Sequence, residues 1–299
     1  LKSIKKAARK GVEEELIKRV KNIINEKELT IDFENKIIWQ NNPIAKVKKG
    51  ENYLAPEIEI IADDALPLDE TKELEKYLKN WIDLYINELL GDLINLTKIK
   101  IENQYLRALA YQLYENNGVL KRNNVDDIIR LISKEERKKL WKMGIKIGRY
   151  HIFLPKMLKP KAVKLRTMLW KIYNNISIDL NIPKFGLNFV KNQNYNEKFL
   201  LLCGFERFND YFVRIDILEK LFINIIDVTV DKKFKISSEM MNLLGCTKEN
   251  FFMLMKLMNY RKSKDDDTYY FFSNNKKNKD KVALNKNKVS PFSKLLALN

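Results

Sequence analysis

A stretch of 42 residues from Arg137 to Ile178 has twelve lysine or arginine residues and no aspartate or glutamate. Several cations with no neighbouring anion to neutralise them are what binding to phosphate groups requires. Affinity then comes from the release of counterions from the phosphates, and it grows with the number of cations in contact. The stretch, called the basic strip below, therefore predicts contact with RNA or DNA, most simply as a single strand.

The cations of the basic strip crowd a predicted turn and the first turns of the helix after it. Three aromatic residues lie among them, Tyr150, Phe153 and Trp170, and such rings can stack on bases. A place in the protein core is the commoner role for Phe153 and Trp170. We assign nucleic-acid contact in the strip to Lys146, Arg149, His151, Lys156, Lys159, Lys161, Lys164 and Arg166.

The one histidine, His151, and the carboxylates are the residues that could take part in catalysis. No Ser, Cys or Asp stands at a telling spacing from His151, so we interpret it as a phosphate contact or a packing residue. The chain has no GxxxxGK[ST] loop, no GxGxxG after a strand and no DExH box. The acidic groups Glu13–Glu15 and Asp265–Asp267 are typical of a helix surface and a turn. We assign no catalytic residue, no metal ligand and no cofactor to this chain.

The composition of the 299 residues limits the classes of protein that fit. The formal net charge is +17, although a chain rich in Lys, Asn and Ile can owe part of this to an AT-rich genome. Cys203 and Cys246 lie in apolar surroundings without zinc or disulfide spacing, which fits the cytoplasm. No apolar run approaches the roughly 18 residues of a membrane span, and no signal peptide is recognised, so no membrane partner is expected. Because the chain begins with Leu1, we expect a fragment of a longer protein.

Hydrophobic periodicity predicts a mainly α chain with small β elements, an α+β fold. A Ser133–Glu136 capping box is predicted before one of the helices. Alternating β-branched runs between turn residues predict a small antiparallel module over 29–62, and residues 144–154 alternate like a strand or hairpin arm. Residues 181–200 are interpreted as an irregular loop. The predicted helices span 4–28, 69–91, 101–116, 124–131, 134–143 and 161–173.

The C-terminal third has the order of elements of a winged helix. A helix over 215–228, a short helix over 237–245 and a helix over 247–260 precede a predicted hairpin. The last helix and the hairpin offer cations to nucleic acid, although Asp265–Asp267 at the hairpin tip would repel phosphate. Many such modules serve instead as protein-packing units. The candidate contacts here are Lys248, Arg261 and Lys262.

These patterns divide the chain into five regions. We expect an N-terminal helix at the end of an upstream domain, a small β module, a helical domain with the basic strip, a winged-helix-like domain and a disordered basic tail. Their expected bounds are 1–28, 29–62, 63–180, 181–272 and 273–299.

Several segments also resemble a known family in the same order along the chain. The most specific is GIKIGRYHIFLPKMLKPKAVKLRTMLW, with its Gly144, Gly148, His151, Phe153 and Pro155, then Leu158, Lys159 and Pro160. The others are FENKIIWQNNPIAKV, RALAYQLYENNGVL, VRIDILEKL, LLGCTKENFFMLMKLMNYR and SPFSKLLALN. Together they resemble the C-terminal half of alphaproteobacterial DExH-box helicases, which are related to the RNA helicase of the mitochondrial degradosome. The resemblance covers most of 29–299.

The resemblance implies an ATP-dependent superfamily 2 helicase that acts on RNA or DNA. The family's ATP and Mg²⁺ sites lie in two upstream RecA-like domains that are absent here, so no catalytic residue is carried over. It implies that this chain is the accessory region that grips a strand beside the motor or binds partners, without catalysis of its own. The alternatives are a stand-alone winged-helix regulator and a ribosome- or RNA-associated adaptor without enzymatic activity.

Overall fold

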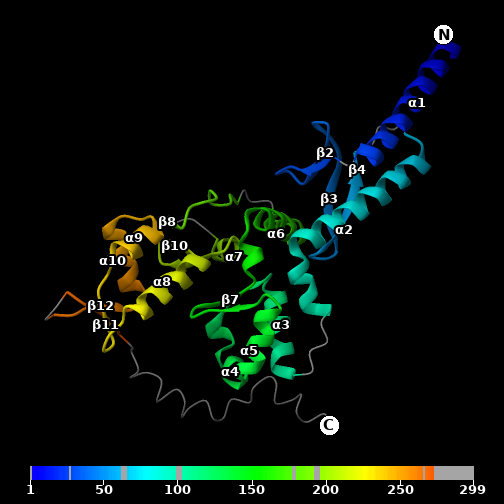
Figure 1. The fold of residues 1–299 in the computed structure, drawn as a ribbon. Helices are drawn as coiled ribbons and strands as arrows, with labels where there is room; N and C mark the ends of the chain where they lie inside the picture. Colours follow the sequence, from blue (N-terminus) through cyan, green and yellow to red (C-terminus); the bar gives the residue numbers. More distant parts are fainter. Residues whose placement is uncertain are drawn as a thin grey trace. The chain divides into compact units, whose positions relative to one another are not determined.

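The computed structural model describes residues 2–26, 28–61, 66–98, 103–176, 180–191, 196–264 and 267–272 (Figure 1). The predicted tail 273–299 lies outside the described residues. The chain forms two compact units, Leu1–Glu219 and Lys220–Asn299. Their boundary falls within one helix, α8 (Ile215–Asp227). More of the described residues lie in helices than in strands, and every sheet is small and antiparallel, as the sequence predicted.

The first unit begins with α1 (Lys2–Glu26) and a four-stranded sheet in the order β1-β2-β3-β4. Alternate residues of the strands are buried, as Ile37 and Trp39 are in β2. β4 contacts α2 and β3 contacts α6, so helices cover the sheet (Figure 1). This antiparallel sheet lies within the range 29–62 that was predicted to hold a small β module. Its strands are β1 (Leu29–Ile31), β2 (Lys36–Trp39), β3 (Asn42–Asn52) and β4 (Ala55–Ile60).

The helix α2 (Leu68–Lys98) is longer than predicted and does not end near Gly91. An added Cβ at Gly91 would meet only the Asn87 side chain, at 3.7 Å, so this glycine is an ordinary helical residue. The seven buried Leu and Ile residues of α2 include Leu93 and Leu96 beyond Gly91, and this burial outweighs the low helix propensity of glycine. α2 packs against the first of the next three helices, which in turn contacts the second, and the third has the predicted Ser133–Glu136 capping box. These are α3 (Gln104–Glu115), α4 (Asp126–Leu131) and α5 (Lys134–Lys142).

The expected hairpin arm over 144–154 is the hairpin β6–β7, and it has a third strand that the sequence did not reveal. β7 pairs with β6 on one side and with β5 on the other, all antiparallel. The basic strip continues from β7 through a 3₁₀ turn into α6. The elements are β5 (Val119–Lys121), η1 (Arg122–Asn124), β6 (Lys146–Ile147), β7 (His151–Phe153), η2 (Pro155–Leu158) and α6 (Pro160–Tyr173).

The prediction of an irregular loop over 181–200 is wrong in part. A strand and a short helix form there, and a following hairpin completes a sheet in the order β8-β10-β9. The hairpin turns at Asn209, whose φ of 53° is the left-handed conformation that two-residue hairpin turns use. The elements are β8 (Phe189–Lys191), α7 (Glu197–Leu202), β9 (Phe205–Phe208) and β10 (Tyr211–Arg214).

One hydrophobic cluster joins most of the first unit. It runs from Val20 in α1 through the sheet, α2 and α3 to Leu169 in α6. The regions predicted to be separate at residues 28 and 62 therefore share one hydrophobic core. That they fold as separate domains with these boundaries stays a prediction. No helix among the described residues has the length and apolar character to cross a bilayer.

The second unit contains the end of α8, two short helices and a three-stranded sheet in the order β11-β13-β12. Ser237 and Thr247 cap the two helices with their side chains, and Gly245 ends the first at φ 65°. The helix predicted to reach residue 260 ends earlier, because Asn259 adopts a φ of 66° and Tyr260 begins a strand. The bounds are β11 (Lys233–Phe234), α9 (Ser238–Leu244), α10 (Lys248–Leu257), β12 (Tyr260–Lys262) and β13 (Tyr269–Phe271).

Candidate nucleic-acid interface

The basic strip does not form one continuous charged surface. It runs through α5, β6, β7, η2 and α6, and its side chains range from fully exposed to fully buried. The predicted contacts therefore divide into cations that are exposed to solvent and residues that are buried in the protein.

Three exposed lysines at the start of α6 are the strongest candidates. Lys159, Lys161 and Lys164, called the α6 lysines below, have no ion pair among the described residues, and the Lys164 ammonium contacts only aromatic rings. Lys159 is the N-cap of α6 and makes no side-chain cap, and the first turn holds no acidic residue. The partial positive charge at this helix end therefore adds to that of the lysines.

Three other cations of the strip already have neighbours within the protein. The Lys156 Nζ lies 3.0 Å from Asp92 Oδ1 in an exposed ion pair. The Lys146 Nζ lies 5.8 Å from the centroid of the buried Phe153 ring. The Arg149 side chain is exposed, and its backbone N–H is bound within the protein. Lys156 and Arg149 stay accessible to a ligand, but Lys156 would have to exchange its partner.

Arg166 was predicted to contact nucleic acid, and the structure contradicts this. Its relative exposure is 0%, so no strand can reach the guanidinium. The two terminal nitrogens donate hydrogen bonds to the backbone carbonyls of Asn117, Met157 and Leu202. Burial lowers its pKa from the ordinary arginine value. Arg166 therefore joins three chain segments from the inside, which its helical spacing from Lys161 could not reveal.

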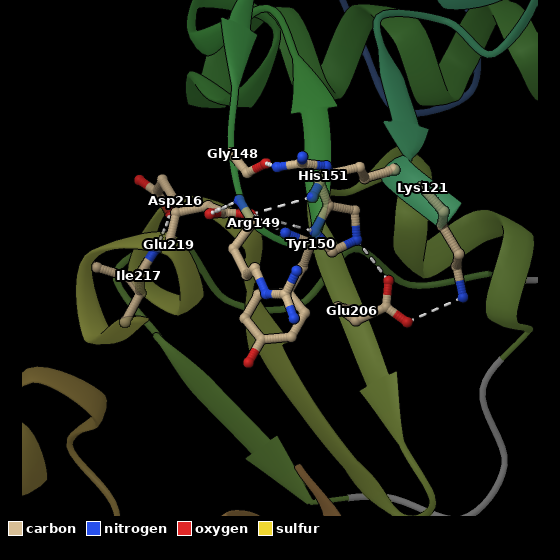
Figure 2. Close-up of polar contacts among 10 residues, drawn as sticks. Lys121, Gly148, Arg149, Tyr150, His151, Glu206, Asp216, Ile217 and Glu219 are labelled. Carbon is tan, nitrogen blue, oxygen red and sulfur yellow. Dashed lines mark hydrogen bonds and ion pairs between the residues drawn. The ribbon is translucent and has the colours of Figure 1, made fainter. Parts of the chain in front are cut away.

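His151 is likewise no surface contact, because it is only 1% exposed. Its Nε2 lies 2.5 Å from Glu206 Oε2, and its Nδ1 lies 3.9 Å from Glu219 Oε1. Figure 2 shows the Glu206 carboxylate between the imidazole and Lys121, whose Nζ donates to Glu206 Oε1 at 2.9 Å. Lys121 also donates to Glu197 at 2.9 Å. We call His151, Lys121, Glu197, Glu206 and Glu219 the His151 cluster.

The charges of the His151 cluster stabilise one another. Burial acts to lower the pKa of His151, but the hydrogen bond with Glu206 and the charges of both glutamates outweigh it and raise that pKa. Burial acts to raise the pKa values of Glu206 and Glu219, and their hydrogen bonds lower both. An imidazolium between carboxylates is favoured, and it lacks the free basic nitrogen that a general base needs. The arrangement of the His151 cluster therefore suits a structural role.

Glu219 also holds the turn between β6 and β7. Its carboxylate accepts the backbone N–H groups of Arg149, Tyr150 and His151, at 2.6, 2.8 and 3.0 Å (Figure 2). Gly148 allows this approach, since an added Cβ would lie 2.3 Å from the Glu219 carboxyl carbon. Sequence reasoning missed Glu206 and Glu219 because nothing in their local pattern indicates partners that lie 55 and about 70 residues away.

None of the three aromatic residues named in the strip is fully exposed, and Tyr150 and Trp170 are partly buried. Phe153 is buried, and Trp170 packs against Phe199 with ring centroids 6.1 Å apart, so both have the core role considered above. Exposed rings lie beside the α6 lysines instead. Phe33 from the β1–β2 turn and Phe185 from the segment before β8 are 88% and 45% exposed.

The cations predicted in the second unit are exposed but have partners close in sequence. Lys248 lies 5.8 Å from the centroid of Phe252, and the guanidinium of Arg261 lies 3.5 Å from that of Phe272. Lys262 pairs with Asp267 at 2.6 Å. The Asp267 carboxylate lowers the net attraction of Lys262 for phosphate, whereas the neutral rings leave the charges of Lys248 and Arg261 in place.

No family model matches the chain, and neither does any curated protein or solved structure. Within the described ranges, no three side chains of His, Cys, Asp or Glu gather as a metal site would require. The geometry of the chain itself is therefore the basis for a functional interpretation.

Proposed function

We propose that this chain binds single-stranded nucleic acid, RNA or DNA, through the α6 lysines, as the accessory region of an ATP-dependent helicase. The observation that carries the proposal is that Lys159, Lys161 and Lys164 are exposed together on the first turns of one helix. No carboxylate among the described residues pairs with them. The formal net charge of +17 adds a long-range attraction for polyanions.

The internal contacts of the strip support the proposal by fixing the base of α6. Arg166 in α6 binds the carbonyls of the preceding η2 and of α7, and the His151 cluster holds the hairpin that leads into η2. Lysines on a fixed helix end keep a defined spacing, which lowers the entropic cost of binding several phosphates at once. The buried residues of the basic strip, Arg166 and His151, would thus position the exposed α6 lysines.

The resemblance to DExH-box helicases supplies the helicase part of the proposal. It assigns ATP and Mg²⁺ to RecA-like domains upstream, so the chain itself would bind a strand without hydrolysing ATP. The sequence upstream of Leu1 tests this part directly. A phosphate loop and a DExH box there would support the motor, whereas an immediate start codon would favour a stand-alone regulator.

A winged-helix regulator or an adaptor remains the second candidate, and the order of elements in Lys220–Asn299 favours it. The end of α8, β11, α9, α10 and the β12–β13 hairpin follow one another as in a winged helix, with β11 pairing the hairpin. Ile223, Ile226 and Val230 are about half exposed or more, which is typical of a protein-packing surface. This candidate predicts that nucleic-acid binding, if present, depends on Lys248 and Arg261 and not on α6.

The decisive experiment is the affinity of single-stranded RNA for a Lys159→Glu, Lys161→Glu, Lys164→Glu variant over a range of salt. If three phosphate contacts are lost, the slope of log K against log salt should become shallower by about 2, since each contact contributes roughly 0.7 for a single strand. The affinity at low salt should fall at least about tenfold. The chain alone should show no ATPase activity.

A matched control replaces three exposed lysines elsewhere in the same unit, Lys18→Glu, Lys72→Glu and Lys76→Glu. It changes the net charge equally and should lower the affinity only slightly, because these residues lie in α1 and α2. Equal losses in both variants would mean that net charge alone attracts the strand. An unchanged affinity in the α6 variant would contradict the proposed interface.

A further inference from the structure

We propose that Phe33 and Phe185 form a base-stacking subsite beside Lys164, which selects strands with unpaired bases. This rests on the proposed function and deepens it, because lysines alone hold any polyanion, whereas aromatic faces recognise bases. Three segments that are distant in sequence meet here: the β1–β2 turn, α6 and the segment before β8.

Lys164 locates the subsite between the two rings. Its Nζ lies 5.4 Å from the centroid of Phe33 and 5.6 Å from that of Phe185. A base stacked on either ring would therefore bring its own phosphate within reach of the same ammonium. Lys161 lies one helical turn before Lys164 and could hold the next phosphate along the strand.

Both rings are held outward by well-defined turns. In the β1–β2 turn, Asp32 Oδ1 accepts the backbone N–H groups of Glu34 and Lys36, each at 2.8 Å. Phe33 lies at the apex of this turn, and its exposure of 88% is extreme for so large an apolar side chain. A flat apolar partner that covers the ring would remove this surface from water.

Phe185 lies in a tight turn of its own. The N–H of Leu187 donates to the carbonyl of Lys184 at 3.3 Å, and Gly186 adopts a φ of 94° that other residues rarely take. Phe185 also borders a cleft whose lining residues are mostly apolar, among them Leu158, Pro160 and Val163, and include the cations Lys184 and Arg214. The cleft gives a base on Phe185 further apolar surface to cover.

The charges around the subsite favour a polyanion. Lys184 is exposed and has no ion pair among the described residues. Two nearby acids are neutralised, because Glu34 pairs with Lys36 at 2.6 Å and Asp216 pairs with Arg214 at 2.6 Å, and Asp32 accepts two backbone N–H groups. A neutral aromatic ligand could stack on the two rings but would not be attracted by the lysines. A double helix would offer phosphates to the lysines but no unpaired base faces to the rings. A single strand uses both.

The test compares an oligothymidine strand with an abasic strand of the same length and charge, by fluorescence anisotropy on the whole chain. A Phe33→Leu, Phe185→Leu variant keeps every charge and removes both aromatic faces. We expect it to bind oligothymidine about tenfold more weakly, since stacking contributes roughly 1–3 kcal/mol per base. Its affinity for the abasic strand and its salt dependence should stay unchanged. The matched control is Tyr111→Leu, which removes an exposed aromatic residue from α3 and should change neither affinity.

The outcomes separate the subsite from the proposed function. If the wild-type chain binds neither strand at low salt, the proposed function fails. If it binds both strands equally and the leucine variant binds as the wild type does, the lysines bind by charge alone and the subsite is overturned. Equal losses for both strands also overturn it. A Phe33→Trp variant gives a second measurement: relative to the wild type, oligothymidine should quench its added fluorescence and the abasic strand should not.

Discussion

The Nε2 atom of His151 lies 2.5 Å from Oε2 of Glu206, and the His151 side chain is almost completely buried while that of Glu206 is 12% exposed. The two residues come from different strands, β7 and β9, which belong to different sheets. Their contact, extended by Lys121 and Glu219, is a polar link between the sheet of the basic strip and the sheet before α8, beside the apolar contacts of Val119, Phe153 and Ile215. Its charges make the stability of the chain depend on pH.

We expect the His151 cluster to contribute most to stability between about pH 4.5 and 6.5. The pKa of His151 is raised above its ordinary 6.5, so its contribution is complete below 6.5 and is lost as the pH rises through the raised value. The pKa of Glu206 is lowered below 4.5, so its contribution is complete above 4.5 and is lost as the pH falls through the lowered value. The melting temperature of the wild type minus that of His151→Gln should therefore peak in this window. A difference that grows above pH 8 would contradict the assignment of an imidazolium.

Gly148→Ala should destabilise the fold by about 1–3 kcal/mol, because its Cβ would overlap the Glu219 carboxylate. Glu219→Ala should also destabilise it, since three backbone N–H groups lose their acceptor. Once Glu219 is shortened, alanine at 148 meets little resistance. Urea unfolding of the double variant should show a loss well below the sum of the two single losses. Strict additivity would mean that the two residues act independently.

Arg166→Lys should lower the free energy of unfolding by about 2–4 kcal/mol. A lysine ammonium cannot reach the carbonyls of Asn117, Met157 and Leu202 together, and it would be buried without those partners. Urea denaturation measures the loss. As a control, Lys161→Met in the same helix should change stability by no more than about 0.5 kcal/mol, because its side chain is exposed.

The cations of the second unit should matter less for binding than the α6 lysines. A Lys248→Glu, Arg261→Glu, Lys262→Glu variant changes the net charge as much as the α6 variant does. Because Lys262 already pairs with Asp267, and the acidic run Asp265–Asp267 would repel phosphate, we expect the affinity for single-stranded RNA to fall less than about threefold. Titration at one fixed salt concentration compares the two variants. A larger loss here than in the α6 variant would favour the winged-helix regulator.

Local patterns in the sequence were enough for most elements. Most helices, the four-stranded sheet and the capping box at Ser133 follow from periodicities and spacings within a few residues, so they could be predicted. The hairpin at Asn209 had a local signal too, an asparagine between two aromatic β-branched runs, which the interpretation as a winged-helix region passed over. At Gly91 the local pattern predicted the end of a helix that in fact continues, because buried residues on both sides of Gly91 hold the helix in place.

The sequence by itself determined that this chain has a large excess of cations and that twelve of them lie in the basic strip, which contains no acidic residue. Only the tertiary structure decided which of them face solvent. Arg166 and Lys164 are two residues apart in one helix, yet the first is buried among carbonyls and the second lies between two exposed rings. The reason is physical: helical periodicity limits which residues share a face, but the environment of a face is set by segments that arrive from far along the chain. The backbone of Arg149 meets Glu219 across 70 residues, a pairing that no local spacing encodes.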